Sequence, residues 1–234
     1  MNKANPKRRR IVLMRHGAVD YIDGNGIPVL AETVPLTERG RAQADAAGSL
    51  FARHDVGFDR VIASGLPRTM ETAQRVLAAG GQAVPIEVEP KLREIRGGSV
   101  LHIPRQELAA EFAAFTRIGN VEDVRFLGGE SIGSLLDRVI PAFASIVASP
   151  GWHCLLLVLH GAVNRAILSH ALTGGRSFLG RIEQSPACIN IIDVGVDDFI
   201  VRATNLAPTQ WLHEHERDTS MERLLSQYLG RCQP

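Results

Sequence analysis

The chain has 234 residues, of which 45% are hydrophobic and 22% charged, and its formal net charge at pH 7 is +1. This length fits one large domain, and the nearly neutral charge argues against nucleic acid or an anionic membrane as a partner. No stretch approaches the ~18 consecutive apolar residues that a membrane-spanning helix requires.

A basic run, KRRR at 7–10, closes the polar opening of the chain. The apolar stretch after it is only IVLM, too short for the apolar region of a signal peptide. We therefore predict that residues 1–9 are a flexible basic tail of a cytoplasmic protein. The three cysteines, Cys154, Cys188 and Cys232, lie far apart without a C-x-x-C pair, which is typical of reduced thiols.

The chain then alternates between short apolar runs and helical patterns. In chain order we predict a strand over 10–14, a helix over 35–54, a strand over 58–64, a helix over 69–79, a strand over 84–90, a strand over 151–160, a helix over 161–172, and a hairpin of strands over 187–195 and 199–205. Such alternation indicates an α/β fold with a mostly parallel, buried sheet, and the hairpin adds an antiparallel edge.

Residues 96–135 interrupt this alternation with a helical stretch, RQELAAEFAAF, followed by a glycine-rich one, LGGES. We interpret 96–135 as a cap insertion over the functional site, within a single domain spanning 1–234. At the other end of the chain, 219–230 has apolar residues at helical spacing and is predicted to be a short helix that closes the core, edges the site or joins a neighbouring chain.

The polar residues that follow the predicted strands point to one site. In an open parallel sheet, ligands bind beyond the carboxyl ends of the strands. The residues that this rule places at that edge are Arg15, His16 and Gly17 after the first strand, Ser64 and Arg68 after the second, Glu94 beyond the third, and His160 and Gly161 after the fourth. Two arginines, two histidines and a carboxylate are therefore expected to converge.

These residue types suit phosphoryl transfer. Two guanidinium groups can bind phosphate oxygens in forked geometry, and a neutral imidazole is a competent nucleophile for phosphorus. Glu94 would donate a proton to the leaving oxygen, and the second histidine would stabilise charge in the transition state. The glycines after both histidines would let ligand oxygen approach the backbone. No metal or other cofactor is expected, because the side chains supply the cations.

Other motifs carry less weight. Neither His16 nor His160 has a second ligand at the spacing of a zinc site. Gly128-Gly129 is typical of a turn, and HEHER at 213–217 fits an exposed helix at least as well as a metal site. The remaining isolated histidines receive structural roles: His102, His153 and His170.

Six blocks together make this chain resemble the histidine phosphatase (phosphoglycerate mutase-like) superfamily. They are LMRHG at 13–17, PLTERGRAQA at 35–44, SGLPRTMETA at 64–73, LREI at 92–95, GGES at 128–131 and VLHGAVNRAIL at 158–168. The resemblance implies a three-layer α/β/α sandwich and catalysis through a phosphohistidine.

The same resemblance implies a role for each matching residue. His16 is the nucleophile and Glu94 the general acid. His160 belongs to both the catalytic and the phosphate-binding set, and Arg15 and Arg68 bind phosphate, with Ser64 and Gly161 shaping that pocket. The chain departs from the family after R-H-G, where AVDYID replaces the usual Glu-Thr, so Asp20 and Tyr21 are only weak candidates for substrate contact. It also departs after LREI, where RGGSVLH lacks the family's second acidic residue.

The favoured function is that of a metal-independent phosphomonoesterase, a phosphatase acting on a small phosphorylated metabolite. One alternative is a phosphoglycerate-type mutase, although the insertion lacks that branch's Tyr-Glu-Arg-Arg block and is rich in leucine, alanine and phenylalanine. The other is a non-catalytic regulatory module that binds phosphate. No nucleic-acid or membrane partner is expected, and a homodimer is a possible assembly that the sequence does not decide.

Overall fold

The computed structural model describes residues 8–23, 27, 29–117, 119–210, 213 and 217–230, with Leu101 described for its backbone alone. Its centre is a six-stranded sheet in the order β3-β2-β4-β1-β5-β6. The strands are β1 (Arg9–Arg15), β2 (Arg60–Ala63), β3 (Ile86–Val88), β4 (Cys154–Leu159), β5 (Ile189–Val194) and β6 (Phe199–Leu206). The first four run parallel, and β5 and β6 form the predicted antiparallel edge.

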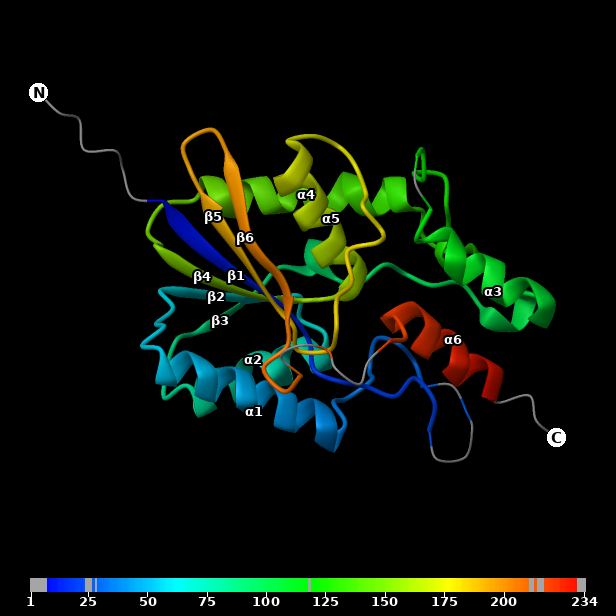
Figure 1. Cartoon of the computed structure of the whole chain (residues 1–234), viewed down its shortest axis with the longest axis horizontal. Coiled ribbons are helices and arrows are strands. Elements are labelled where there is room, and N and C mark those ends of the chain that lie inside the picture. Colours follow the sequence, from blue (N-terminus) through cyan, green and yellow to red (C-terminus); the bar gives the residue numbers. More distant parts are fainter. Residues whose placement is uncertain are drawn as a thin grey trace, which may run out of the picture.

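The central strands are apolar on both faces, and each face has its own core. Along β1, Ile11 and Leu13 face one core, whereas Val12 and Met14 face the other. This alternation follows from the two-residue period of a strand. Helices therefore have to cover both faces, which is the three-layer α/β/α sandwich expected from the sequence (Figure 1).

Helices α1 (Glu38–Arg53) and α2 (Pro67–Ala79) cover one face of the sheet (Figure 1). The hydroxyl of Thr37 caps α1 by accepting the Gly40 N–H. Helix α2 begins at Pro67, two residues earlier than predicted. Proline is favoured at the first position of a helix, because it has no N–H that would be left unpaired there.

Helices α4 (Ile132–Ala148) and α5 (Gly161–Thr173) cover the opposite face (Figure 1). The sequence analysis missed α4, whose Leu135, Leu136 and Phe143 are completely buried. Pro141 would normally interrupt a helix, but here it is exposed and its ring points away from the core.

The predicted basic tail, 1–9, was wrong at Arg9, which is the first residue of β1. Arg8 pairs with Asp198, and Arg9 lies 4.1 Å over the ring of Trp152 while donating to two carbonyl oxygens at the end of α4. These arginines fasten the start of the sheet, since each has a fixed partner. Residues 1–7 lie outside the described residues.

Helices α3 (Arg105–Ala114) and α6 (Ser220–Leu229) lie side by side beyond the carboxyl ends of the parallel strands (Figure 1). They share a small apolar cluster in which Leu108 and Phe112 of α3 pack against Leu225 and Tyr228 of α6. The C-terminal helix therefore packs mainly against α3, and its Met221 also contacts the main core. Among the described residues, no helix combines the length and apolarity needed to cross a membrane.

Candidate active site

The register of the parallel strands brings the ends of β1 and β4, and with them the His-Gly pairs at 16–17 and 160–161, to the same edge of the sheet. Arg15, the last residue of β1, pairs with Leu159, the last residue of β4. The next residues, His16 and His160, consequently reach the same edge of the sheet, where their ring centroids lie 5.2 Å apart. Both rings are buried, with 1% and 0% of their surfaces exposed. The predicted proximity of the two imidazoles is therefore observed.

Four buried nitrogen atoms at this edge lack a hydrogen-bond partner within the described part of the chain. They are Nε of Arg15, Nε2 of His16, Nε of Arg68 and Nδ1 of His160. A buried polar atom left unpaired costs about 1–3 kcal/mol, so such atoms rarely gather without a reason. Their clustering at the edge predicted to bind ligand indicates a pocket built for an anion.

The remaining contacts of the two arginines hold them in place. Arg15 donates from Nη1 to the carbonyl oxygen of Gln184 at 2.5 Å, and Arg68 donates from Nη1 to that of Ala31 at 2.5 Å. Each guanidinium thus uses one nitrogen on the backbone of a neighbouring loop. Its Nε has no such contact.

The environment of His16 fixes which ring nitrogen is reactive. Nδ1 lies 2.8 Å from the carbonyl oxygen of Gly17, and because a carbonyl only accepts, Nδ1 carries the hydrogen. Nε2 therefore keeps its lone pair. Burial, followed by the charges of Arg68 and Arg15, holds the pKa of His16 well below its ordinary value. The ring is consequently neutral at physiological pH.

Ser64 and His160 are in direct contact. The end of β2 is in register with β4, so the hydroxyl of Ser64 lies 2.7 Å from Nε2 of His160. Burial is the main cause that lowers the pKa of His160, and the nearby Arg68 adds to it. Ser64 orients the second imidazole, which is more specific than the general pocket-shaping role that the sequence suggested.

Glu94 is half-buried and lies at the beginning of α5. Its carboxylate accepts hydrogen bonds from the Ile95 N–H at 2.9 Å and from the Ala162 N–H at 3.3 and 3.4 Å. Ala162 follows His160 by two residues, so the carboxylate is held beside the second histidine at a helix N-terminus. This places an acid at the rim of the anion pocket.

Arg138 and Glu130 hold the segment that carries Glu94, and the sequence analysis did not single out either of them. Arg138 binds the Glu130 carboxylate through Nε at 2.7 Å and Nη2 at 3.0 Å. It also donates to the carbonyl oxygens of Lys91, Arg93 and Glu94. Glu130 is the acidic residue of GGES. The signal in the sequence that could have identified its partner is Arg138 itself, a basic residue in the largely apolar sequence of α4.

Gly17 is explained by packing rather than by ligand approach. A side chain at Gly17 would overlap the carbonyl oxygen of Gly40 in α1, and one at Gly40 would overlap that of Ala18. The Gly17 N–H donates to Thr72 and the Ala18 N–H donates to Gln43. The helices after β1 and β2 thus clamp the backbone next to His16, which differs from the role we predicted for this glycine.

Gly161 lies against the guanidinium groups that flank the pocket. A Cβ atom there would come within 3.2 Å of Nη1 of Arg165 and 3.7 Å of Nε of Arg15. The tighter of these contacts is with Arg165, whereas a Cβ atom would meet Arg15 at an ordinary van der Waals distance. A part for Gly161 in phosphate binding stays a prediction.

Asp20 and Tyr21 do not join the buried cluster. Asp20 is exposed and Tyr21 is half-buried, in the loop after β1. The Tyr21 N–H donates to the side chain of Gln227 at 3.4 Å, which connects this loop to α6. Contact of either residue with substrate stays a prediction.

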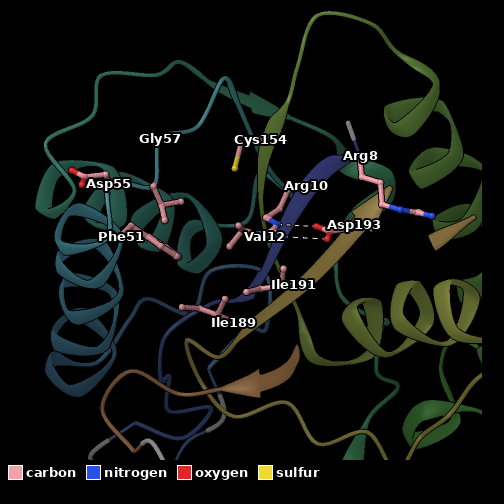
Figure 2. A pocket seen from close by; sticks show the side chains of 11 residues that line it. Arg8, Arg10, Val12, Phe51, Asp55, Gly57, Cys154, Ile189, Ile191 and Asp193 are labelled. Carbon is pink, nitrogen blue, oxygen red and sulfur yellow. Dashed lines mark hydrogen bonds and ion pairs between the residues drawn. The ribbon is translucent and has the colours of Figure 1, made fainter. Parts of the chain in front are cut away.

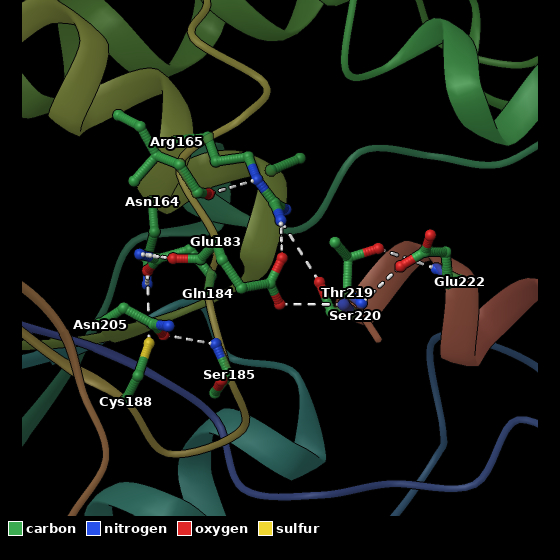
Figure 3. A network of polar contacts seen from close by, with 12 residues as sticks. Asn164, Arg165, Glu183, Gln184, Ser185, Cys188, Asn205, Thr219, Ser220 and Glu222 are labelled. Atoms are coloured by element: carbon green, nitrogen blue, oxygen red, sulfur yellow. Dashed lines mark hydrogen bonds and ion pairs between the residues drawn. The ribbon is translucent and has the colours of Figure 1, made fainter. Parts of the chain in front are cut away.

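A polar network behind Arg15, also missed from the sequence, ties α5 to α6 (Figure 3). Arg165 is buried and donates to the carboxylate of Glu183 at 3.2 Å, and Glu183 accepts the Ser220 N–H at 2.9 Å. The neighbouring Gln184 is completely buried and accepts a hydrogen bond from Asn164. Since the backbone oxygen of Gln184 holds Arg15, this network fixes one side of the anion pocket.

The other motifs do not form a second centre in the described residues. His213 contacts the carbonyl oxygen of Asn205 and, like Arg217, is not helical, while 214–216 lie outside the described residues. No group of three or more His, Cys, Asp or Glu side chains in the described ranges is arranged to hold a metal ion. Cys154 and Cys188 are free thiols, and Cys232 lies outside those ranges.

A cavity of about 410 Å³ lies at the opposite end of the strands (Figure 2). It opens between α1 and the start of β1, and its lining includes Phe51, Cys154 and Ile189. The arginines there are paired with aspartates: Figure 2 shows Arg10 and Asp193, whose ion pair measures 2.7 Å, and Arg8 pairs with Asp198. Its lining thus lacks the unpaired cationic nitrogens that mark the carboxyl edge.

Comparisons with known proteins agree with this geometry. The model of the histidine phosphatase superfamily (branch 1) matches residues 11–207. A curated relative from Salmonella paratyphi A, named "Probable phosphoglycerate mutase GpmB", is 32% identical over 165 residues, which cover 70% of this chain and 74% of the relative.

Solved structures show the same fold. The alpha-ribazole phosphatase from Shigella flexneri is 24% identical, with a TM-score of 0.63, and the match covers 84% of this chain and 96% of that one. A mycobacterial glucosyl-3-phosphoglycerate phosphatase is also 24% identical, with a TM-score of 0.67, covering 85% of this chain and 99% of that one.

Proposed function

Because this chain belongs to the histidine phosphatase superfamily, as its sequence motifs predicted, we propose that it is a metal-independent phosphomonoesterase that forms a phosphohistidine on His16. The substrate is a small phosphorylated metabolite. The observation that carries the proposal is the group of four unpaired buried nitrogens, from Arg15, His16, Arg68 and His160. A tetrahedral phosphate offers oxygens to the two arginines and lies against Nδ1 of His160 while its phosphorus faces His16.

The first step transfers the phosphoryl group to the protein. The lone pair on Nε2 of His16 attacks phosphorus, and the bond to the ester oxygen breaks. Glu94 gives its proton to that oxygen, so the alcohol leaves neutral. The guanidinium groups of Arg15 and Arg68 bind the equatorial oxygens and offset their charge without rearranging, because both side chains are already held.

The second step returns the protein to its initial state. Water attacks the phosphohistidine opposite Nε2, and Glu94, now a carboxylate, accepts a proton from that water. The bond from phosphorus to Nε2 breaks, and inorganic phosphate leaves. The Nδ1–H···O contact of His16 with the Gly17 carbonyl keeps the same tautomer through both steps.

The test is hydrolysis of p-nitrophenyl phosphate with a metal chelator present. The wild-type protein is expected to turn over under these conditions, and His16→Ala is expected to lose about 10⁴-fold or more of kcat. His54→Ala is the matched control, because this exposed histidine lies at the end of α1 and should leave turnover unchanged. Turnover abolished by the chelator, or retained by His16→Ala, would refute the proposal.

A phosphoglycerate-type mutase is the second candidate, favoured by the name of the 32% identical relative. A mutase has to retain a bisphosphorylated intermediate, so its activity would require priming by a bisphosphorylated acid and yield an isomer in place of inorganic phosphate. Phosphate release from monophosphorylated acids without priming favours the esterase. If phosphate raises the melting temperature but no substrate turns over, the protein is a phosphate-binding module.

A further inference from the structure

A chain of buried hydroxyl groups runs from the backbone of α2 to the ring of His160. Oγ1 of Thr69 lies 2.8 Å from the carbonyl oxygen of Leu66, Oγ of Ser64 lies 3.0 Å from Oγ1 of Thr69, and Nε2 of His160 lies 2.7 Å from Oγ of Ser64. Ser64, Thr69 and His160 are all completely buried. No solvent contact competes with these bonds, so each hydroxyl must direct its single hydrogen within the chain.

The direction of every bond follows from its first member. A carbonyl oxygen only accepts, so the Thr69 hydroxyl donates to Leu66. Oγ1 of Thr69 then has only lone pairs to offer, and the Ser64 hydroxyl donates to it. The oxygen of Ser64, which also accepts the Leu66 N–H at 3.4 Å, is left to accept from His160. Nε2 of His160 consequently carries a hydrogen.

The reverse direction conflicts with the geometry. If Ser64 donated to His160, the contact between Ser64 and Thr69 would need the Thr69 hydrogen. The oxygens of Thr69 and Leu66 would then face each other at 2.8 Å with lone pairs on both sides. A threonine inside a helix commonly donates to the carbonyl three or four residues earlier, which matches the first arrangement.

The opposite nitrogen of His160 is therefore an acceptor in the ligand-free protein. Burial and the surrounding cations hold the pKa of His160 well below its usual value, so the ring is neutral and Nδ1 has a lone pair. The charged or titratable groups that face the ring are His16 and Arg15 at the end of β1, Arg68 of α2 and Arg138 of α4, with Glu94 bound to the start of α5. Among them, the nearest ring, His16, is also neutral.

A phosphate dianion cannot satisfy this nitrogen, because it has no hydrogen to donate. The monoanion has one P–O–H group and can. We propose that Thr69, acting through Ser64, is a positioning residue that keeps the hydrogen of His160 on Nε2, so that Nδ1 accepts a hydrogen bond from the monoanion of the bound phosphate group. The complex then holds one proton more than the free protein and the dianion. This inference rests on the proposed phosphate site and specifies the charge state that the site selects.

Calorimetric titration with inorganic phosphate counts this proton directly. The titration is repeated in two buffers of different ionisation enthalpy at about pH 8.5, where phosphate is mainly a dianion. We expect an uptake of about one proton per bound phosphate, and an affinity that weakens about tenfold per pH unit across the alkaline range.

Thr69→Val tests the role of the hydroxyl chain. Valine has the same shape without the lone pairs, and the carbonyl oxygen of Leu66 keeps two backbone donors, the N–H groups of residues 69 and 70. The Ser64 hydroxyl is then free to donate to Nε2, and Nδ1 of His160 can carry the hydrogen. Proton uptake should fall to nearly zero and the alkaline loss of affinity should flatten. Thr69→Ser restores the chain and should restore both.

Glu94 and His16 are the other groups in the site that could take up the proton. Neither depends on Thr69, so an uptake that persists in Thr69→Val would place the proton elsewhere and overturn the inference. Uptake retained in Glu94→Gln and lost in Glu94→Gln/Thr69→Val would support it. Thr69→Ala removes the same lone pairs should valine prevent folding.

The wild-type measurement can also refute the inference by itself. Phosphate binding without proton uptake would mean that Nδ1 of His160 already carries a hydrogen, and the proposed function would stand. Absence of any phosphate binding would remove the proposed function and this inference together.

Discussion

The two edges of the parallel sheet treat their cationic side chains in opposite ways. At the amino edge, Arg8 and Arg10 are held by Asp198 and Asp193 beside the cavity of about 410 Å³. At the carboxyl edge, Arg15 and Arg68 have no acidic partner among the described residues and keep a buried nitrogen unpaired. The cavity at the amino edge is therefore not the better candidate site.

This difference shows what identifies a binding site in an α/β fold. The charge of a paired arginine is already offset by a carboxylate of the protein, as it is for Arg8 and Arg10 near the start of β1. An unpaired buried guanidinium remains costly until an anion arrives, and only the fold around it keeps it in position. Equivalent substitutions at the two edges should therefore have very different effects.

The largest contrast is expected between two acids. Glu94→Gln should slow hydrolysis of an alkyl phosphate by about 10³-fold, because the poor leaving group needs its proton, but should slow p-nitrophenyl phosphate by no more than about tenfold. The same acid-to-amide change at the amino edge, Asp193→Asn, should leave both rates within about twofold. Steady-state rates on the two substrates give the comparison, and equal losses on both would remove Glu94 from the acid's role.

Arginine-to-lysine changes test whether the cations themselves differ. Arg68→Lys keeps the charge but loses the fork and Nε, so kcat/KM should fall by about 10²-fold. Arg10→Lys, at a half-exposed ion pair, should change kcat/KM by less than about twofold. If the two variants lost activity equally, the contrast between the edges would have no functional meaning.

The residues of the site were predictable because they follow strands whose order could be read from the sequence. His16, Ser64 and His160 come directly after apolar runs, and a parallel sheet brings such positions together. The residues that hold them were not predictable in this way. Arg138 donates to the backbone oxygen of Glu94, and the backbone oxygen of Gln184 accepts from Arg15. Both contacts join segments far apart in the sequence, and no local pattern records them.

The missed helix has a local explanation. Pro141 stands in the middle of α4 and normally signals the end of a helix, but it is exposed, and the apolar residues on the other side of α4 are buried in the core. The basic run at 7–10 was misread for a similar reason. Its partners, Asp198 and Trp152, lie in the second half of the chain, so its composition alone resembled a solvated tail.

The two buried histidines should make the carboxyl edge sensitive to mild acid. Their pKa values are well below the value of about 6.5 in the unfolded chain, so below that pH the unfolded state binds protons that the folded state does not. The free energy of unfolding should therefore decrease as pH falls, by up to about 1.4 kcal/mol per pH unit for each histidine.

Urea unfolding of the wild type and His16→Asn between about pH 7 and about pH 5 measures this contribution. The variant should lose stability less steeply, because one of the two proton-binding differences is gone. Saturating phosphate should also flatten the wild-type slope. Parallel slopes for the two proteins would mean that His16 is not buried in its neutral form.

The smallest effect is expected at Asp193, and it should appear at a different pH. Arg10, and after it burial and Arg202, determine the pKa of this carboxyl, which lies below its ordinary value. Its stabilising contribution is therefore fully present above the unfolded value of about 3.9 and disappears as pH falls through the lower folded value.

Because both arginines are about half exposed, Asp193→Asn should cost only about 1 kcal/mol near neutral pH. Urea unfolding should show this deficit unchanged from about pH 7 to about pH 5, the range in which His16→Asn changes the slope. A deficit that vanished in that higher range would mean that the amino edge, too, contains an unpaired titrating group, and the distinction between the two edges would fail.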